Sequence, residues 1–143
     1  MRHPRSRRFL FLEISGGLFL LSLAMPAIVV MEAPLLWGPS HEKTYLGIHC
    51  LALGWLLFPG WLANPLLIAA ALVHSFERHG VALLLTSLAV VSAVIAPIIL
   101  IDGPDMMKLE YLDVGYYVWF ASIIVLFAGA AVGVRQRRRA WMA

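Results

Sequence analysis

The stretch WLLFPGWLANPLL, Trp55–Leu67, combines side chains suited to lipid with two residue pairs that normally end helices. Pro59 cannot donate the backbone hydrogen bond of an interior turn, and Gly60 tolerates the positive φ that often ends a helix. Asn64 followed by Pro65 is typical of a helix start, because Asn accepts bonds from free first-turn amides and Pro suits the first helical position. This stretch therefore predicts a helix that is interrupted and then resumes.

The composition of the whole chain indicates a membrane protein. Of its 143 residues 62% are hydrophobic and 13% are charged, and the mean hydropathy is +0.86. A soluble domain has about 25% charged residues, so this chain has too few polar side chains to cover its apolar surface in water. We expect one integral membrane domain over residues 1–143. Its single cysteine, Cys50, excludes an internal disulfide framework and a multi-cysteine metal site.

Long apolar segments predict an all-α fold with four transmembrane helices. The candidate spans are Phe9–Met31, Tyr45–Ser75, Val81–Ile101 and Val114–Val134. About 20 helical residues cross ~30 Å of hydrocarbon, and all but the second segment fit this length. The second would be roughly 46 Å long as one helix. We expect it to cross once, as the pieces Tyr45–Phe58 and Pro65–Ser75 joined by the break, rather than to turn back as a re-entrant hairpin.

The distribution of basic residues predicts the orientation. Nine of the eleven Lys and Arg residues precede the first span, follow the last, or lie between the second and third: Arg2, Arg5, Arg7, Arg8, Arg78, Arg135, Arg137, Arg138 and Arg139. Cytoplasmic loops carry the excess of Lys and Arg, so we expect both termini in the cytoplasm and a bacterial inner membrane as the location. The terminal arginines would attract anionic lipid, which explains the basic pI without nucleic acid.

The break supplies the candidate ligand-binding residues. Irregular backbone within a membrane persists only where protein or trapped water satisfies it, and broken helices flank substrate sites in transporters. We therefore assign Trp61 and Asn64 at the break, and His49 in the preceding piece, as candidate ligand-binding residues. The alternative is a kink that only shapes the fold and is capped by Asn64.

Small residues mark the faces on which helices approach one another. In lipid, close packing of helices depends on Gly, Ala and Ser. Gly129 and Gly133 form a G-x-x-x-G pair in the fourth span, and Ala89 and Ala93 share a face of the third. We expect these four residues to pack the helices within the chain, with docking to a partner protein or a second copy as the alternative.

The predicted outer surface has two further features. The segment PDMMKLEYLD, residues 104–113, is expected to form a short surface helix beginning at Pro104. Aromatic residues near this face, among them Tyr116 and Trp119, are expected to anchor the helices at the depth of the lipid headgroups, with the lining of a groove as the alternative.

Reactive motifs are missing from the sequence. It contains no nucleophile elbow, Walker loop, H-E-x-x-H or paired-carboxylate motif. A haem between helices would need a histidine facing His49, and the other spans contain none. We expect no enzyme, no catalytic residue, no metal site and no cofactor.

At GWLxxxxWLANPLL, Gly54–Leu67, and GYYVWFAS, Gly115–Ser122, the sequence resembles small four-span bacterial membrane proteins without an assigned activity. The similarity covers the second span and the start of the fourth. It implies a compact four-helix fold with a break at the Trp-Leu-Ala-Asn-Pro motif, and it supplies no ligand or partner.

Two functional hypotheses remain. The first is a structural or accessory membrane protein that docks to other membrane subunits, or to itself, through small-residue helix faces, because the spans contain almost no ionisable groups and the loops are short. The alternative is a small oligomeric transporter or channel whose site is the break between Pro59 and Asn64.

Overall fold

The computed structural model describes residues 4–32, 40–57, 59–101 and 107–142. Helices account for 79% of these residues. In chain order the elements are α1 (Pro4–Leu23), β1 (Pro26–Glu32), β2 (His41–Leu46), α2 (Gly47–Leu57), the 3-10 helix η1 (Pro59–Leu62), α3 (Ala63–Ser75), α4 (His79–Ile101), β3 (Met107–Leu112) and α5 (Val114–Met142).

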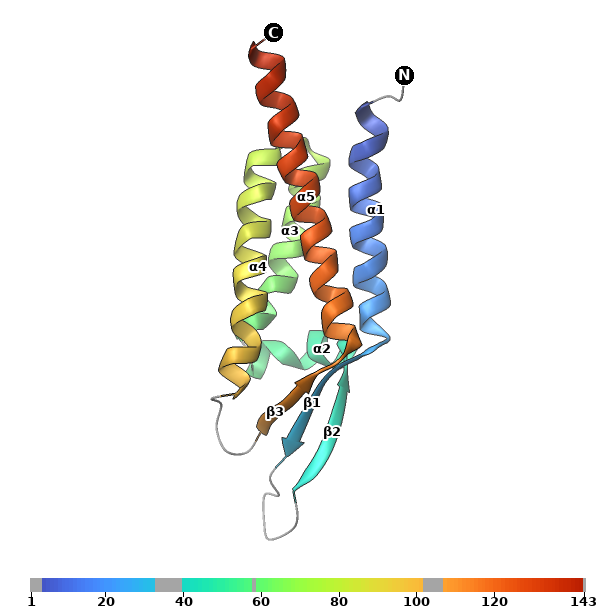
Figure 1. The fold of residues 1–143 in the computed structure, drawn as a ribbon, viewed down its shortest axis with the longest axis vertical. Helices are drawn as coiled ribbons and strands as arrows, with labels where there is room; N and C mark the ends of the chain where they lie inside the picture. The colour runs from blue at the N-terminus through green and yellow to red at the C-terminus, as the bar shows by residue number, and fades with distance from the viewer. Residues whose placement is uncertain (1–3, 33–39, 58, 102–106, 143) are drawn as a thin grey trace.

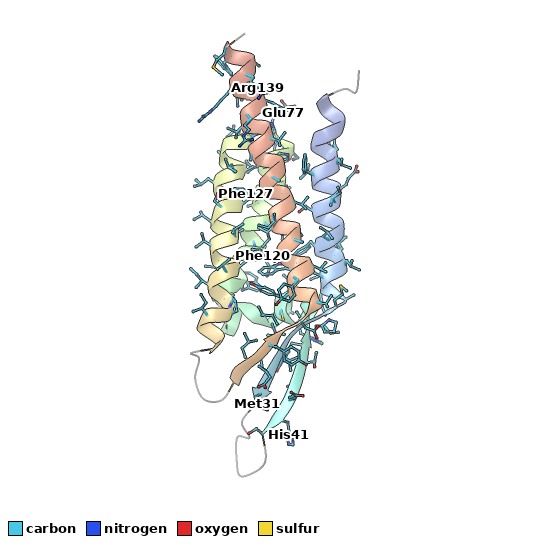
Figure 2. All side chains as sticks on the ribbon, viewed as in Figure 1. Met31, His41, Glu77, Phe120, Phe127 and Arg139 are labelled. Atoms are coloured by element: carbon cyan, nitrogen blue, oxygen red, sulfur yellow. The ribbon has the colours of Figure 1, made fainter. Side chains whose placement is uncertain are left out.

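The helices α1, α3, α4 and α5 run alongside one another, and α1 begins at the same end of the bundle as α5 finishes (Figure 1). The short helix α2 crosses the opposite end of the bundle, and the sheet extends beyond it (Figure 1). Figure 2 accordingly places Met31 and His41 at the sheet end of the molecule, and Glu77 and Arg139 at the other end.

The core of the bundle contains many small side chains. The principal helix contacts join α1 to α5, α3 to α4 and α4 to α5. Ala89 and Ala93 of α4 are fully buried, and Gly129 and Gly133 of α5 are also buried. A Cβ atom at Gly129 would lie 2.8 Å from Cβ and Cγ of Phe11, so only glycine lets α1 approach α5 this closely. All four small residues that were expected at helix contacts are therefore buried between helices of this chain.

The first expected span, Phe9–Met31, is not one helix. The helix α1 ends at Leu23, where Ala24 N donates to Leu21 O and Met25 N donates to Ser22 O. Pro26 has no N–H with which to continue the helix, and the Ile28-Val29-Val30 run that follows is β-branched and favours a strand. This run forms β1, whose central residues are buried.

The central strand β1 pairs antiparallel with β2 on one side and β3 on the other. Residues Met107–Leu112, expected to be helical, form the strand β3, while residues 102–106 lie outside the described chain. Tyr45, expected to begin a helix, lies in β2 opposite Ile28. The alternation of MKLEYL suits a strand with two different faces, and β1 supplies the backbone partner that makes this conformation favourable.

The interruption of the second segment lies where the sequence predicts it, but its details differ. The helix α2 begins at Gly47, η1 occupies Pro59–Leu62 and α3 begins at Ala63; Phe58 lies outside the described residues. No glycine among the described residues has a positive φ. Gly60 is needed for space instead, because a Cβ atom there would overlap the side chain of Ala96 on α4.

Some helices of the structure are long enough to match the thickness of a membrane. Within the described residues, His79–Ile98 and Val114–Met142 are long and apolar enough to cross a bilayer, by length and composition alone. The apolar helical segments Phe9–Leu23 and Gly60–Ser75 are shorter.

Candidate binding pocket at the helix break

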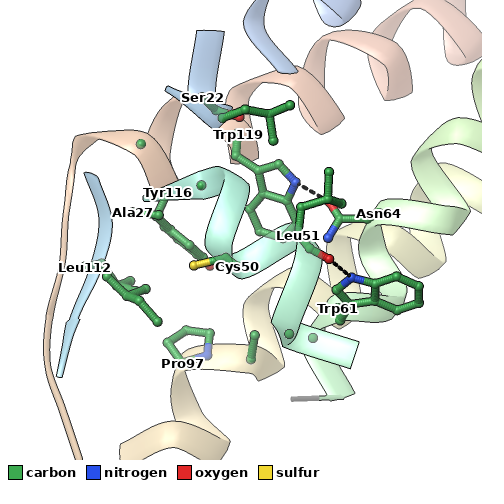
Figure 3. Close-up of a pocket in the computed structure, with 17 residues that line it drawn as sticks. Ser22, Ala27, Cys50, Leu51, Trp61, Asn64, Pro97, Leu112, Tyr116 and Trp119 are labelled. Carbon is green, nitrogen blue, oxygen red and sulfur yellow. Dashed lines mark hydrogen bonds between the residues drawn. The ribbon is translucent and has the colours of Figure 1, made fainter. Parts of the chain in front are cut away.

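A cavity of about 100 Å³ lies where the bundle meets the sheet, directly beside the break, and is partly open to the exterior. We call it the break pocket (Figure 3). Nearly every element contributes to its lining, which is mainly apolar. The lining residues are Ser22, Leu23, Ala27, Ile28, Gly47, Cys50, Leu51, Gly54, Gly60, Trp61, Asn64, Ala96, Pro97, Leu112, Gly115, Tyr116 and Trp119.

Trp61 contributes to the wall of the break pocket beside α2. Its Nε1 donates to the backbone oxygen of Leu51 at 2.7 Å (Figure 3). A Cβ atom at Gly54 would lie 3.1 Å from Cδ1 of Trp61, so the glycine allows the ring to rest against α2. The backbone oxygen of Leu51 and the indole thus hold η1 and α2 in a fixed relation across the break.

Asn64 does not cap α3, contrary to the sequence-based expectation. The N-cap position is Leu62, which makes no side-chain cap bond, and Asn64 is already the second helical residue. Its Oδ1 accepts a hydrogen bond from Nε1 of Trp119 at 2.9 Å, linking α3 to α5 (Figure 3). Asn64 is only 8% exposed, so this polar contact lies within the fold.

The Trp119 bond also fixes the orientation of the Asn64 amide. Because an indole N–H is only a donor, the amide atom that faces it must be the oxygen. The Nδ2 group therefore points away from Trp119, and in the part of the chain that the structure describes no acceptor bonds to it. Asn64 thus offers two N–H donors at the wall of an apolar cavity.

The two hydroxyl groups of the break pocket already have acceptors. Tyr116 Oη donates to the backbone oxygen of Ala93 at 2.8 Å, and Ser22 Oγ donates to Phe19 O at 2.6 Å. The Cys50 sulfur points into the cavity (Figure 3). Desolvation by burial raises the pKa of the Cys50 thiol to about 11, so the thiol is neutral near pH 7. A neutral thiol is a weak nucleophile, and we assign it no chemical role.

Of the candidate ligand-binding residues, Trp61 and Asn64 line the break pocket but His49 does not. His49 is exposed on the outer side of α2, where its Nδ1 accepts from Leu46 N at 3.3 Å. The helical phase of α2 turns Cys50, Leu51 and Gly54 inward instead.

Tyr116 and Trp119, for which headgroup anchoring and the lining of a groove were both considered, line this cavity. A local reading of aromatic residues cannot separate these two positions, since both combine an apolar ring with a polar tip.

The described residues do not bring metal-ligating side chains together into a site. No group of three His, Cys, Asp or Glu side chains lies close enough there to hold a metal ion.

Comparison with protein families finds no model that matches this sequence, and comparisons with curated proteins and with solved structures give no match either. The resemblance based on the Trp-Leu-Ala-Asn-Pro motif stays a prediction.

Proposed function

We propose that the chain is a membrane protein of four spans, α1, α3, α4 and α5, with both termini in the cytoplasm and the sheet outside. The low burial of α4 supports this placement, because only 22% of its most apolar window is covered by the rest of the molecule. A core helix of a soluble protein would be largely covered. Segments shorter than ~30 Å can be accommodated by local thinning of the bilayer at modest cost.

Within this topology the break pocket lies at the outer edge of the membrane, where α2 crosses the end of the bundle. We propose that it binds a small apolar group carrying a hydrogen-bond acceptor, such as the ester end or a short segment of a lipophilic molecule. The observation that supports this function is the Asn64 Nδ2 group at the wall of an otherwise apolar cavity. Ligand sites commonly combine an apolar lining with a few such polar groups.

The volume of the break pocket limits the size of the ligand. A dry apolar cavity of about 150 Å³ holds a benzene molecule. At about 100 Å³ the break pocket holds only a few non-hydrogen atoms. The rest of a larger ligand would extend out through the open side of the pocket. Acceptor recognition by Asn64 would select a carbonyl over a hydrocarbon of the same size.

The single cysteine provides the test. Because Cys50 lines the break pocket, a bound molecule should slow its reaction with a small neutral methanethiosulfonate reagent. We expect methyl propanoate to protect Cys50 better than n-hexane, a hydrocarbon of similar size. Asn64→Leu should remove this preference. The matched control Ser87→Ala should keep it, since Ser87 Oγ bonds within α4 to Leu83 O and lies away from the cavity. Equal protection by both compounds in the unmodified protein would contradict the proposal.

A second candidate function, docking to another copy of this chain, is supported by the outer face of α4. Exposed apolar side chains recur along it at alternating spacings of three and four residues: Val81, Leu84, Leu88, Val91, Ile95 and Ile98. Rows with this spacing form the contact between parallel helices in coiled coils, and copies inserted in one orientation can bring the same row together about a two-fold axis. In lipid, van der Waals contact between such rows would have to hold the pair, because these side chains are larger than those of the closest helix contacts. The buried small residues Ala89, Ala93, Gly129 and Gly133 are not available for this contact.

Cysteine cross-linking tests self-association. In a Cys50→Ala background, Leu88→Cys should give a disulfide-linked dimer on mild oxidation. Ile68→Cys, on the exposed face of α3, serves as the control for random collision in the membrane. Cross-linking of both variants at the same rate would contradict a seam on α4.

A further inference from the structure

The end of the bundle opposite the break pocket contains a second hollow, formed where α3 turns into α4. Arg78 N donates to Val73 O and Glu77 N donates to His74 O. These two bonds define a Schellman turn, which normally has glycine in the left-handed position. Here that position is occupied by Glu77, with a φ of 63°. The turn brings Arg78 directly to the start of α4.

The helix α5 forms the other wall of this hollow. Gly133 faces His79, and a Cβ atom there would lie 2.5 Å from Cγ of the imidazole, so glycine is required for this contact. Gln136 and Arg137 follow Gly133 by three and four residues and therefore share its face of the helix. The resulting cavity of about 540 Å³ is mainly polar, and its lining residues are Phe76, Glu77, Arg78, His79, Gly133, Gln136 and Arg137. We call it the basic cleft.

The basic cleft has a net positive charge, because its lining contains two arginines and one glutamate. The side-chain amide of Gln136 adds N–H donors to the lining. The helix α4 also begins at His79, so the positive end of its dipole adds to the potential.

We propose that the basic cleft binds a phosphate group, through Arg78 and Arg137. Guanidinium groups match phosphate in geometry as well as in charge, since two parallel N–H donors bond two oxygens. The turn between α3 and α4, which contributes to the cleft lining, lies at the end of the bundle where α1 begins and α5 finishes (Figure 1), and Figure 2 shows Glu77 and Arg139 at that end. A phosphate group there can belong to a lipid headgroup or to a small phosphate in solution. This proposal does not depend on the break pocket at the other end.

Native mass spectrometry of the delipidated full-length protein tests the proposal with phosphatidylglycerol as the probe and diacylglycerol of the same chains as its phosphate-free match. We expect one phosphatidylglycerol to bind in preference to diacylglycerol. Arg78→Gln and Arg137→Gln should each weaken this binding about tenfold, the scale of one charge-assisted hydrogen bond. Arg78→Lys keeps the positive charge but loses the paired N–H donors of the guanidinium group. It should weaken phosphatidylglycerol binding less than Arg78→Gln does.

Arg135→Gln is the matched control, because it removes the same charge from an exposed position of α5 outside the cleft. We expect a change of less than about twofold, because Arg135 does not line the cleft and its charge would reach a bound phosphate only through solvent. An equal loss in Arg135→Gln, or equal binding of diacylglycerol, would overturn the proposal. Since Arg78 and Arg137 are also exposed, all these variants should keep the melting temperature of the unmodified protein.

Competition with inorganic phosphate separates the two sources of the ligand. Displacement of phosphatidylglycerol by millimolar phosphate, absent in the Arg78→Gln variant, would assign a free phosphate as a sufficient ligand. Retention of the lipid under the same conditions would assign the headgroup together with its chains.

Discussion

The hydrogen bond between Asn64 and Trp119 links α3 to α5 beside the break, and a double-mutant cycle tests its energetic role. The bond is 2.9 Å long, Asn64 is 8% exposed and Trp119 is half-buried, so solvent has restricted access to both partners. Trp119→Phe leaves the amide oxygen unsatisfied, and Asn64→Leu leaves the indole N–H unsatisfied. Each single substitution should cost about 1–3 kcal/mol of unfolding free energy, because an abandoned buried group loses its hydration as well as its bond.

The double variant should cost less than the sum of the two single variants, because it removes both polar groups at once. Hydrogen bonds between membrane helices show coupling energies averaging about 0.6 kcal/mol, with a maximum of about 1.7 kcal/mol. We expect the Asn64–Trp119 coupling to fall in this range. The measurement is reversible unfolding in mixed micelles, with Ser87→Ala combined with Trp119→Phe as an additive control. Strict additivity of Asn64→Leu and Trp119→Phe would refute the inference that this bond stabilises the break.

Substitutions at three further positions, Gly60, Gly133 and Glu77, test the backbone geometry through unfolding free energies, with Ala96→Gly and Gly16→Ala as companion variants. Gly60→Ala should destabilise by about 1–3 kcal/mol because the new Cβ overlaps Ala96, and Ala96→Gly should recover part of this loss. Gly133→Ala should destabilise by a similar amount, because the new Cβ displaces the His79 imidazole. Gly16→Ala, which has no atom within 4 Å of the new Cβ, should instead stabilise α1 by up to about 1 kcal/mol. Equal effects of these two variants would contradict the packing described for α5. Glu77→Gly should stabilise by roughly 1 kcal/mol, because glycine has no penalty at a φ of 63°, and a loss of stability would show that the Glu77 side chain matters more than its backbone.

The sequence predicts the helical parts of this fold well where the signal is local. Proline and glycine at 59–60 and proline at 65 mark an interruption that the structure places at Pro59–Leu62. The third and fourth expected spans correspond to α4 and α5, although α5 continues through the arginine-rich tail to Met142. In each case, the residues that determine the element lie within it.

The sheet could not be anticipated in the same way, because its pairings are non-local. Ile28 pairs with Tyr45 on one side and with Leu112 on the other. Hydropathy alone cannot distinguish the apolar run that forms β1 from the end of a membrane helix. The proline at 26 and the β-branched residues after it were the available signals.

The composition of the break pocket depends on tertiary contacts for the same reason. Local rules interpret Asn64 as a helix cap, but its acceptor bond comes from Trp119, 55 residues away in the chain. Cys50 and Tyr116 reach the same cavity from α2 and α5, and no spacing in the sequence connects them. Trp61 and Asn64 could be picked out from the sequence because the break marks irregular backbone that must face protein or trapped water, and both residues line the cavity beside it; their ligand-binding role stays a prediction.

Cysteine accessibility tests the proposed topology most directly. In a Cys50→Ala background, Thr44→Cys places a thiol on the exposed strand β2, and Ala140→Cys places one near the end of α5. In intact spheroplasts a membrane-impermeant maleimide should label Thr44→Cys, and it should label Ala140→Cys only after the membrane is opened. Labelling of both thiols in sealed spheroplasts would show that the sheet and the arginine-rich end lie on the same side, and the four-span account would then be wrong.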